Sequence, residues 1–135
     1  MRDNLGYVCI CTDRLEEGVR LCEDARTALE SLGAEHFLHQ TLQDLCYGYL
    51  LQERLDAAAT CGERALRLAT EVNDALVAKY CLFLLSEVAV RKGDAFGARR
   101  YLRELSVHFP ETAVSEEIIE VFLTTDLTTV VNLRG

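Results

Sequence analysis

Apolar positions recur along this chain with the spacing of helices rather than strands. Leu5-Gly6-x-x-Cys9, Leu45-Cys46-x-x-Tyr49 and Leu85-Ser86-x-x-Ala89 each place a leucine, a small residue and a mid-sized residue at i, i+1 and i+4. This spacing puts the three side chains on one stripe of a helix, where a small residue allows a neighbouring helix to approach closely. No segment alternates with period two between hairpin signals, so we expect an all-α fold.

The same pattern returns at a fixed offset of 40 residues. Arg14-Leu15-Glu16-Glu17-Gly18 aligns with Arg54-Leu55-Asp56-Ala57-Ala58, and the next step along the chain reaches Ala98. Small residues therefore stand at positions 18, 58 and 98. The offset divides the chain into three helix-turn-helix repeats, at about 1–33, 34–73 and 74–110.

Within these repeats, short polar segments predict where helices end. In the second repeat we expect a helix from about Ala34 to Leu51, a turn at 52–54 and a helix to about Val72. Asn73-Asp74 then predicts a break, with the aspartate as N-cap of the next helix. Lys92-Gly93-Asp94 is the corresponding turn in the third repeat.

The repeating residues resemble the tetratricopeptide repeat, whose signature is W-x2-L-G-x2-Y, then A-x3-F, then P. Leu5-Gly6 matches its first part, Ala58 and Ala98 occupy its alanine position, and Pro110 follows Ala98 where its proline falls. The resemblance covers residues 1–110 and implies a right-handed α-solenoid of three TPR-like repeats. The first two repeats lack the proline, so their second helices can run on, which explains a period of 40 residues.

Residues 111–135 depart from this pattern but carry another apolar stripe. Ile118, Ile119, Phe122 and Leu123 predict C-terminal capping helices that cover the open end of the stack, with a fourth, degenerate repeat as the alternative. We therefore expect one domain over 1–135. The first helix would begin just before Met1, without a polar cap, so the chain is either a fragment of a longer protein or a stack that lacks its first turn.

Charge and hydropathy limit the compartment and the partners. The formal net charge is −8, from 14 basic and 22 acidic residues, which argues against a nucleic-acid partner and otherwise reflects solubility. No apolar run approaches the roughly 20 residues that span a bilayer, and no signal peptide is evident. We expect a cytoplasmic protein that does not bind membranes.

The residues with reactive side chains fit packing better than chemistry. Six cysteines without a secretory signal are expected to be reduced, and Cys9, Cys22 and Cys46 fall at packing positions of the repeat. Cysteine pairs with zinc-ligand spacing are missing, and the pair His36 and His39 is expected at the surface or its boundary. No catalytic motif occurs. We expect no metal, no cofactor and no enzymatic activity.

The resemblance also implies where a partner would bind. In tetratricopeptide repeats the first helix of each pair lines a concave groove. Carried over to this chain, the peptide-binding positions are Asp3, Tyr7, Gln43, Asp44, Tyr47, Tyr80, Phe83, Glu87 and Arg91, accompanied by Ile10, Gln40 and Leu51. The alternative is that the aromatic side chains pack between repeats or against the C-terminal helix. The Lys/Asn carboxylate clamp of chaperone-binding members is missing, which argues against an acidic chaperone tail as ligand.

The sequence as a whole favours a protein–protein interaction scaffold or adaptor that binds a peptide or helix of a partner in this groove. The alternative is a ligand- or peptide-sensing domain of a larger bacterial regulator. A homodimer through the open end of the stack is a third hypothesis.

Overall fold

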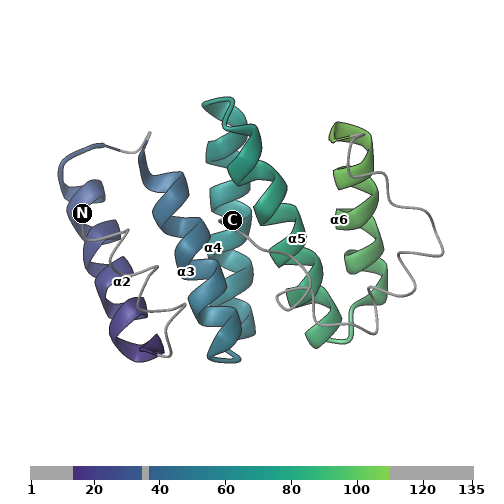
Figure 1. The fold of residues 1–135 in the computed structure, drawn as a ribbon, viewed down its shortest axis with the longest axis horizontal. Helices are drawn as coiled ribbons and strands as arrows, with labels where there is room; N and C mark the ends of the chain where they lie inside the picture. Colours follow the sequence, from purple (N-terminus) through teal and green to yellow (C-terminus); the bar gives the residue numbers. More distant parts are fainter. Residues whose placement is uncertain (1–13, 35–36, 110–135) are drawn as a thin grey trace.

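The computed structural model of the chain describes residues 14–34 and 37–109. These residues form five helices (Figure 1): α2 (Leu15–Ser31), α3 (Leu38–Leu51), α4 (Leu55–Glu71), α5 (Ala75–Arg91) and α6 (Ala95–His108). Within the two described ranges there is no strand, which confirms the all-α prediction for this part of the chain. The predicted first helix and the predicted capping helices over 111–135 lie outside the described residues, as do Asp3, Tyr7 and Ile10.

The turns between helices fall at a regular interval. A positive φ angle occurs every 20 residues, at Gly33 (69°), Glu53 (60°), Asn73 (59°) and Gly93 (77°). The residue after each of these donates its backbone N–H to a carbonyl five residues earlier, as Asp74 does to Ala69 at 2.8 Å. This hydrogen bond closes the preceding helix in a Schellman-type turn. The predicted turns at 52–54, 73–74 and 92–94 are therefore confirmed.

The start of α3 differs from the prediction. We expected a helix from about Ala34, but α3 begins at Leu38. The reason is local, because the N–H of Ala34 donates to Leu29 O at 3.0 Å and so belongs to the turn that ends α2. The later helices have stronger start signals. Asp74 accepts a hydrogen bond from the backbone of Val77, and Asp94 accepts one from the backbone of Gly97.

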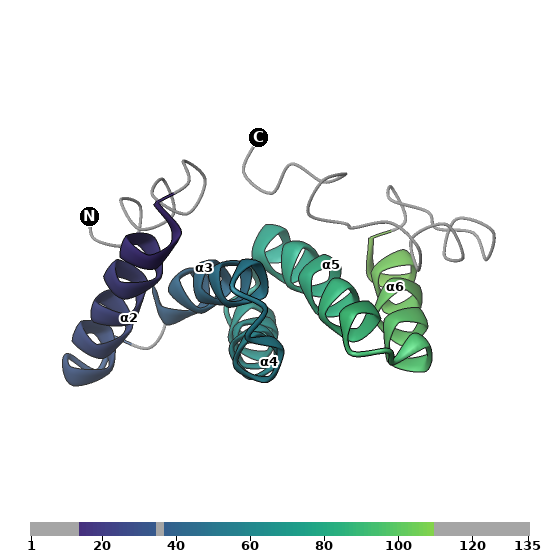
Figure 2. The same cartoon turned by 90° about the horizontal axis from the view of Figure 1, so that it is seen from below.

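Helices that are consecutive in the chain run antiparallel and pack against each other, and α3 also contacts α5 (Figures 1 and 2). We call α3 and α5 the inner helices, because eleven of the 14 residues of α3 and eleven of the 17 residues of α5 are buried. We call α2, α4 and α6 the outer helices, because each buries a single stripe; α2 buries only four of its 17 residues. A helix that is apolar on most sides is expected to be enclosed, whereas an amphipathic one covers a core.

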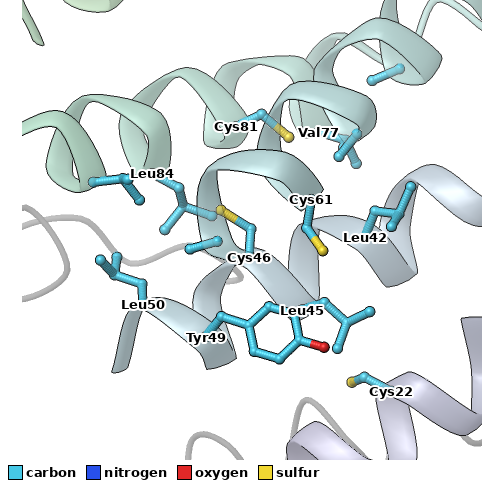
Figure 3. Close-up of a cluster of buried hydrophobic side chains, with 14 of the residues drawn as sticks. Cys22, Leu42, Leu45, Cys46, Tyr49, Leu50, Cys61, Val77, Cys81 and Leu84 are labelled. Carbon is cyan, nitrogen blue, oxygen red and sulfur yellow. The ribbon is translucent and has the colours of Figure 1, made fainter. Parts of the chain in front are cut away.

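Small residues allow the inner and outer helices to approach closely. Gly18, Ala58 and Ala98 are each the fourth residue of an outer helix, and all three are buried. At Gly62 in α4, an added Cβ would lie 2.8 Å from Leu85 Cδ2 and 2.9 Å from Cys46 Sγ. The close approach of a neighbouring helix that was predicted at the small residue Cys46 is therefore present. Cys46 also belongs to the apolar core that Figure 3 shows between α3, α4 and α5.

Candidate functional site

The described residues of the predicted groove all lie on the inner helices, but most of them are covered. Gln43 and Asp44 are each 1% exposed, Glu87 is 2% exposed and Phe83 is 9% exposed. Tyr47 and Tyr80 are half-buried and pack in part against the core. Among the predicted groove residues that the structure describes, these two tyrosines offer the most aromatic surface to a partner.

Phe83 takes part in the contact between α5 and α6. It forms an apolar cluster with Leu82, Leu102 and Leu105, and Tyr101 packs against this cluster. Its ring thus packs between the two helices of the third predicted repeat, whereas the alternative interpretation placed the aromatic side chains between repeats or against the C-terminal helix.

Glu87 and Arg91 join the two inner helices. Arg91 Nη1 donates to Leu50 O at 3.2 Å and to Glu53 Oε1 at 2.8 Å, and its Nε donates to Glu87 Oε1 at 3.1 Å. A guanidinium can satisfy a helix-terminal carbonyl and two carboxylates at once because its donors are fixed in one plane. Arg91 therefore ties the last turn of α5 to the end of α3.

Polar groups buried on α3 include one that sequence reasoning misplaced. His39 is 6% exposed, and its Nε2 lies 2.9 Å from Asp74 Oδ2. The prediction that His39 lies at the surface or its boundary is wrong, because the N-cap of α5 places a carboxylate beside it. The other ring nitrogen, Nδ1, and both amide atoms of Gln43 have no hydrogen-bond partner among the described residues.

Four cysteines of the described part are buried and take part in no disulfide: Cys22, Cys46, Cys61 and Cys81. Figure 3 shows them in the core, where three successive helices contribute Cys46, Cys61 and Cys81. Burial raises the pKa of Cys81 to about 12 and raises the pKa of Cys46 well above its ordinary value. The thiolate is the nucleophile and the metal ligand, so these thiols are inert packing groups, as predicted for Cys22 and Cys46.

Within the described ranges, no group of three or more His, Cys, Asp or Glu side chains is placed to hold a metal ion. The sequence motif Cys9-x-Cys11 lies outside these ranges. The described part of the chain also contains no helix with both the length and the apolar character to cross a bilayer.

A pocket opens between α4, α5 and α6, and sequence reasoning did not foresee it. Its volume is about 460 Å³. Its lining is mostly apolar and includes two carboxylates and one histidine: Leu66, Ala69, Thr70, Asn73, Asp74, Ala75, Ala78, Leu82, Glu104, His108 and Phe109. Because three helices contribute to it, no local spacing in the sequence could have indicated it.

Large apolar side chains are exposed at the end of the molecule next to this pocket. The turns after α2 and α4, the starts of α3 and α5 and the end of α6 all lie at that end, which is uppermost in Figure 1. We call its exposed apolar residues the apolar edge: Leu32 (79% exposed), Phe37 (60%), Val72 (40%), Leu76 (58%) and Val107 (73%). Phe96 (80% exposed) stands at the start of α6, at the opposite end.

Comparison with known proteins does not identify a family for this chain. No family model, no curated protein and no solved structure matches the chain.

Proposed function

We propose that this chain is a protein–protein interaction scaffold, built as a solenoid of TPR-like helix pairs. The helical register supports the solenoid, since outer helices begin at residues 15, 55 and 95 and carry a buried small residue at the same position. The apolar edge is the observation that supports partner binding. Five large apolar side chains exposed at one end of the helices are more than the scattered single residues that a protein surface normally carries.

The residues of the apolar edge come from five different segments of the chain. Leu32 and Val72 occupy equivalent positions in the turns after α2 and α4, Leu76 is the second residue of α5, and Phe37 is the N-cap residue of α3. Burying these side chains against a partner would contribute roughly 25 cal/mol per Å² of apolar surface. The groove predicted from the sequence is a second surface of the same scaffold, with Tyr47 and Tyr80 as its accessible aromatic side chains.

The experiment compares partners captured by immobilised variants of the full chain, quantified by mass spectrometry. The edge variant is Leu32→Ser with Leu76→Ser. Its matched control is Phe96→Ser, because Leu76 and Phe96 are both the second residue of an inner or outer helix and both are exposed. We expect one partner to be retained by the wild type and by Phe96→Ser and to be lost by the edge variant.

A third variant, Tyr47→Ala with Tyr80→Ala, tests the groove. A partner lost only with this variant would place binding in the groove instead of at the edge. If all variants capture the same proteins at the same level, neither surface binds a partner and the proposed function is wrong. Light scattering over a range of concentrations distinguishes a hetero-partner from a homodimer.

A further inference from the structure

The pocket between α4, α5 and α6 lies beside the apolar core and contains none of the predicted groove residues. Its apolar floor comes from Leu66 and Ala69 of α4 and from Ala78 and Leu82 of α5. Asn73, Asp74 and Ala75 form its rim on one side and His108 and Phe109 on another. Pockets that bind small molecules typically have volumes of about 300–1,000 Å³, and this one has a volume of about 460 Å³.

The charges around the pocket are acidic. Asp74 and Glu104 line it, and none of the described lining residues is a lysine or an arginine. Asp74 already receives His39 and the backbone N–H of Val77. Glu104 is half-buried, and within residues 14–34 and 37–109 no hydrogen bond or ion pair engages its carboxylate. A partly desolvated carboxylate beside an apolar wall favours a cationic group that can pair with it.

The rim of the pocket continues into the apolar edge. Val72 precedes the rim residue Asn73, Leu76 follows Ala75, and Val107 precedes His108. An occupant that contacts the rim therefore meets exposed apolar surface beyond the pocket. This continuity favours a segment of a protein over a small molecule, because a molecule that fits inside the pocket would leave the edge uncovered.

We infer that the pocket binds an apolar side chain of a partner protein that lies beside a lysine or an arginine, with the cation paired to Glu104. The net charge of −8 acts in the same direction by attracting basic segments over longer distances. This inference rests on the proposed function, since its ligand is a protein segment. It adds the chemical class of that segment and the place where it docks.

The test uses a phage-displayed library of random twelve-residue peptides, panned on the full chain, followed by fluorescence anisotropy with the individual enriched peptides. We expect the enriched peptides to carry Lys or Arg next to Leu, Ile, Met or Phe. Glu104→Lys should weaken their binding by about tenfold or more, and Glu104→Gln by a smaller factor of about threefold. Glu71→Gln is the matched control for Glu104→Gln, because both remove one negative charge and Glu71 is an exposed residue outside the pocket lining.

A second variant tests the pocket without changing charge. Ala75 is exposed at the rim, so Ala75→Phe adds bulk at the mouth with little demand on the core. It should weaken peptide binding by about tenfold or more through steric exclusion. Far-ultraviolet circular dichroism and thermal unfolding establish that each variant is folded before it is titrated.

The remaining outcomes overturn the inference. Enriched peptides that lack basic residues would exclude the pairing with Glu104. A second contrary outcome is that Glu104→Lys and Ala75→Phe leave peptide binding unchanged. If binding is instead lost with Leu32→Ser and Leu76→Ser, or with Tyr47→Ala and Tyr80→Ala, the pocket is excluded as the binding site and the proposed function stays intact. If no peptide binds, the pocket does not recognise linear segments, and the proposed function is decided by the capture experiment above.

Discussion

The inner helix α5 and the outer helix α4 have the same length of 17 residues but opposite relations to water. Eleven residues of α5 are buried, whereas α4 buries five, all of them Ala, Cys or Gly. Polar groups on α5 are consequently held by partners inside the protein. Ser86 Oγ donates to Phe83 O at 2.7 Å, and Glu87 receives Arg91. Polar groups on α4 mostly face solvent, where their hydrogen bonds compete with water.

The two kinds of helix also differ in what their ion pairs contribute. Arg64 Nη1 of α4 lies 3.4 Å from Glu30 Oε1 of α2, and the two side chains are 35% and 43% exposed. Pairs of this kind contribute about 0–1 kcal/mol. The side chains of Arg91 and Glu87 are 18% and 3% exposed, so removing one of them leaves the other charge poorly solvated. Breaking an ion pair on an inner helix is therefore expected to cost more stability than breaking one on an outer helix.

The largest expected change in the stability of the folded protein comes from alkaline pH, which acts on its buried groups. Burial raises the pKa of Cys81 to about 12, and Tyr49, also buried and hydrogen-bonded to Glu23, has its pKa raised to about 12. The folded state holds both groups neutral, so the unfolded chain ionises first. The contribution of the thiol to the stability of the folded state is complete below pH about 8.5, and that of the phenol below pH about 10. Both contributions are lost as the pH rises towards 12.

Thermal unfolding in reducing buffer, measured from pH 7 to about pH 12, tests this expectation. The midpoint should fall steeply at the upper end of the range, and the fall should be shallower in Cys81→Ala than in the wild type. An unchanged slope in that variant would show that the buried thiols are not responsible.

The second prediction compares two leucines of α5. Leu85 is 1% exposed and Leu76 is 58% exposed. Leu85→Ala removes apolar contacts with α4 and leaves a cavity, so we expect it to lower the free energy of unfolding by about 2–5 kcal/mol. Leu76→Ala should change it by less than about 0.5 kcal/mol. Urea denaturation measures both, and equal costs would contradict the assignment of α5 as an inner helix.

The third prediction compares two N-cap residues. Asp74 caps α5 and also contacts His39, whereas Asp94 caps α6 through the backbone of Gly97. Asp94→Ala should cost about 1 kcal/mol, the usual contribution of a cap. Asp74→Ala should cost about 2–3 kcal/mol, because it also leaves the buried imidazole of His39 without this partner. The double variant His39→Leu with Asp74→Ala should recover part of the difference, and no recovery would mean that the contact contributes little.

The smallest effects are expected at the turns. Gly93 has a φ angle of 77°, and an added Cβ would meet no atom within 4 Å, so Gly93→Ala isolates the backbone strain. We expect it to cost about 1 kcal/mol. Asn73→Gly at the equivalent turn should stay within about 0.5 kcal/mol, since asparagine already tolerates this conformation. A larger cost for Asn73→Gly than for Gly93→Ala would contradict the assignment of these turns as equivalent.

Local chemistry predicted most of the helical organisation. The 40-residue register located the turns at 52–54, 73–74 and 92–94, and aspartate at the start of a helix correctly indicated the caps at Asp74 and Asp94. The start of α3 was misjudged because Ala34 and the residues after it contain no cap, and a turn hydrogen bond claims the N–H of Ala34. A turn or an N-cap that depends on four or five neighbouring residues can therefore be predicted from one sequence.

The candidate sites were less accessible to sequence reasoning. The predicted groove positions share the inner helices, but their burial depends on which helices cover them, and Phe83 packs with Leu102 and Leu105 of α6. His39 meets Asp74 across 35 residues of chain, and the pocket draws its lining from α4, α5 and α6. Neither arrangement leaves a periodic signal in any one helix.

By itself, the sequence determined that this protein is built from antiparallel helices, where they end, and that Cys22 and Cys46 pack in the core. These properties follow from apolar periodicity, turn residues and caps, all of which act over one or two helical turns. Only the tertiary structure decided which polar groups are enclosed, that Glu104 faces an open apolar pocket, and that one end of the helices exposes apolar side chains. Those outcomes depend on the packing of segments distant in the sequence, because burial and electrostatic pairing are set by neighbours in space.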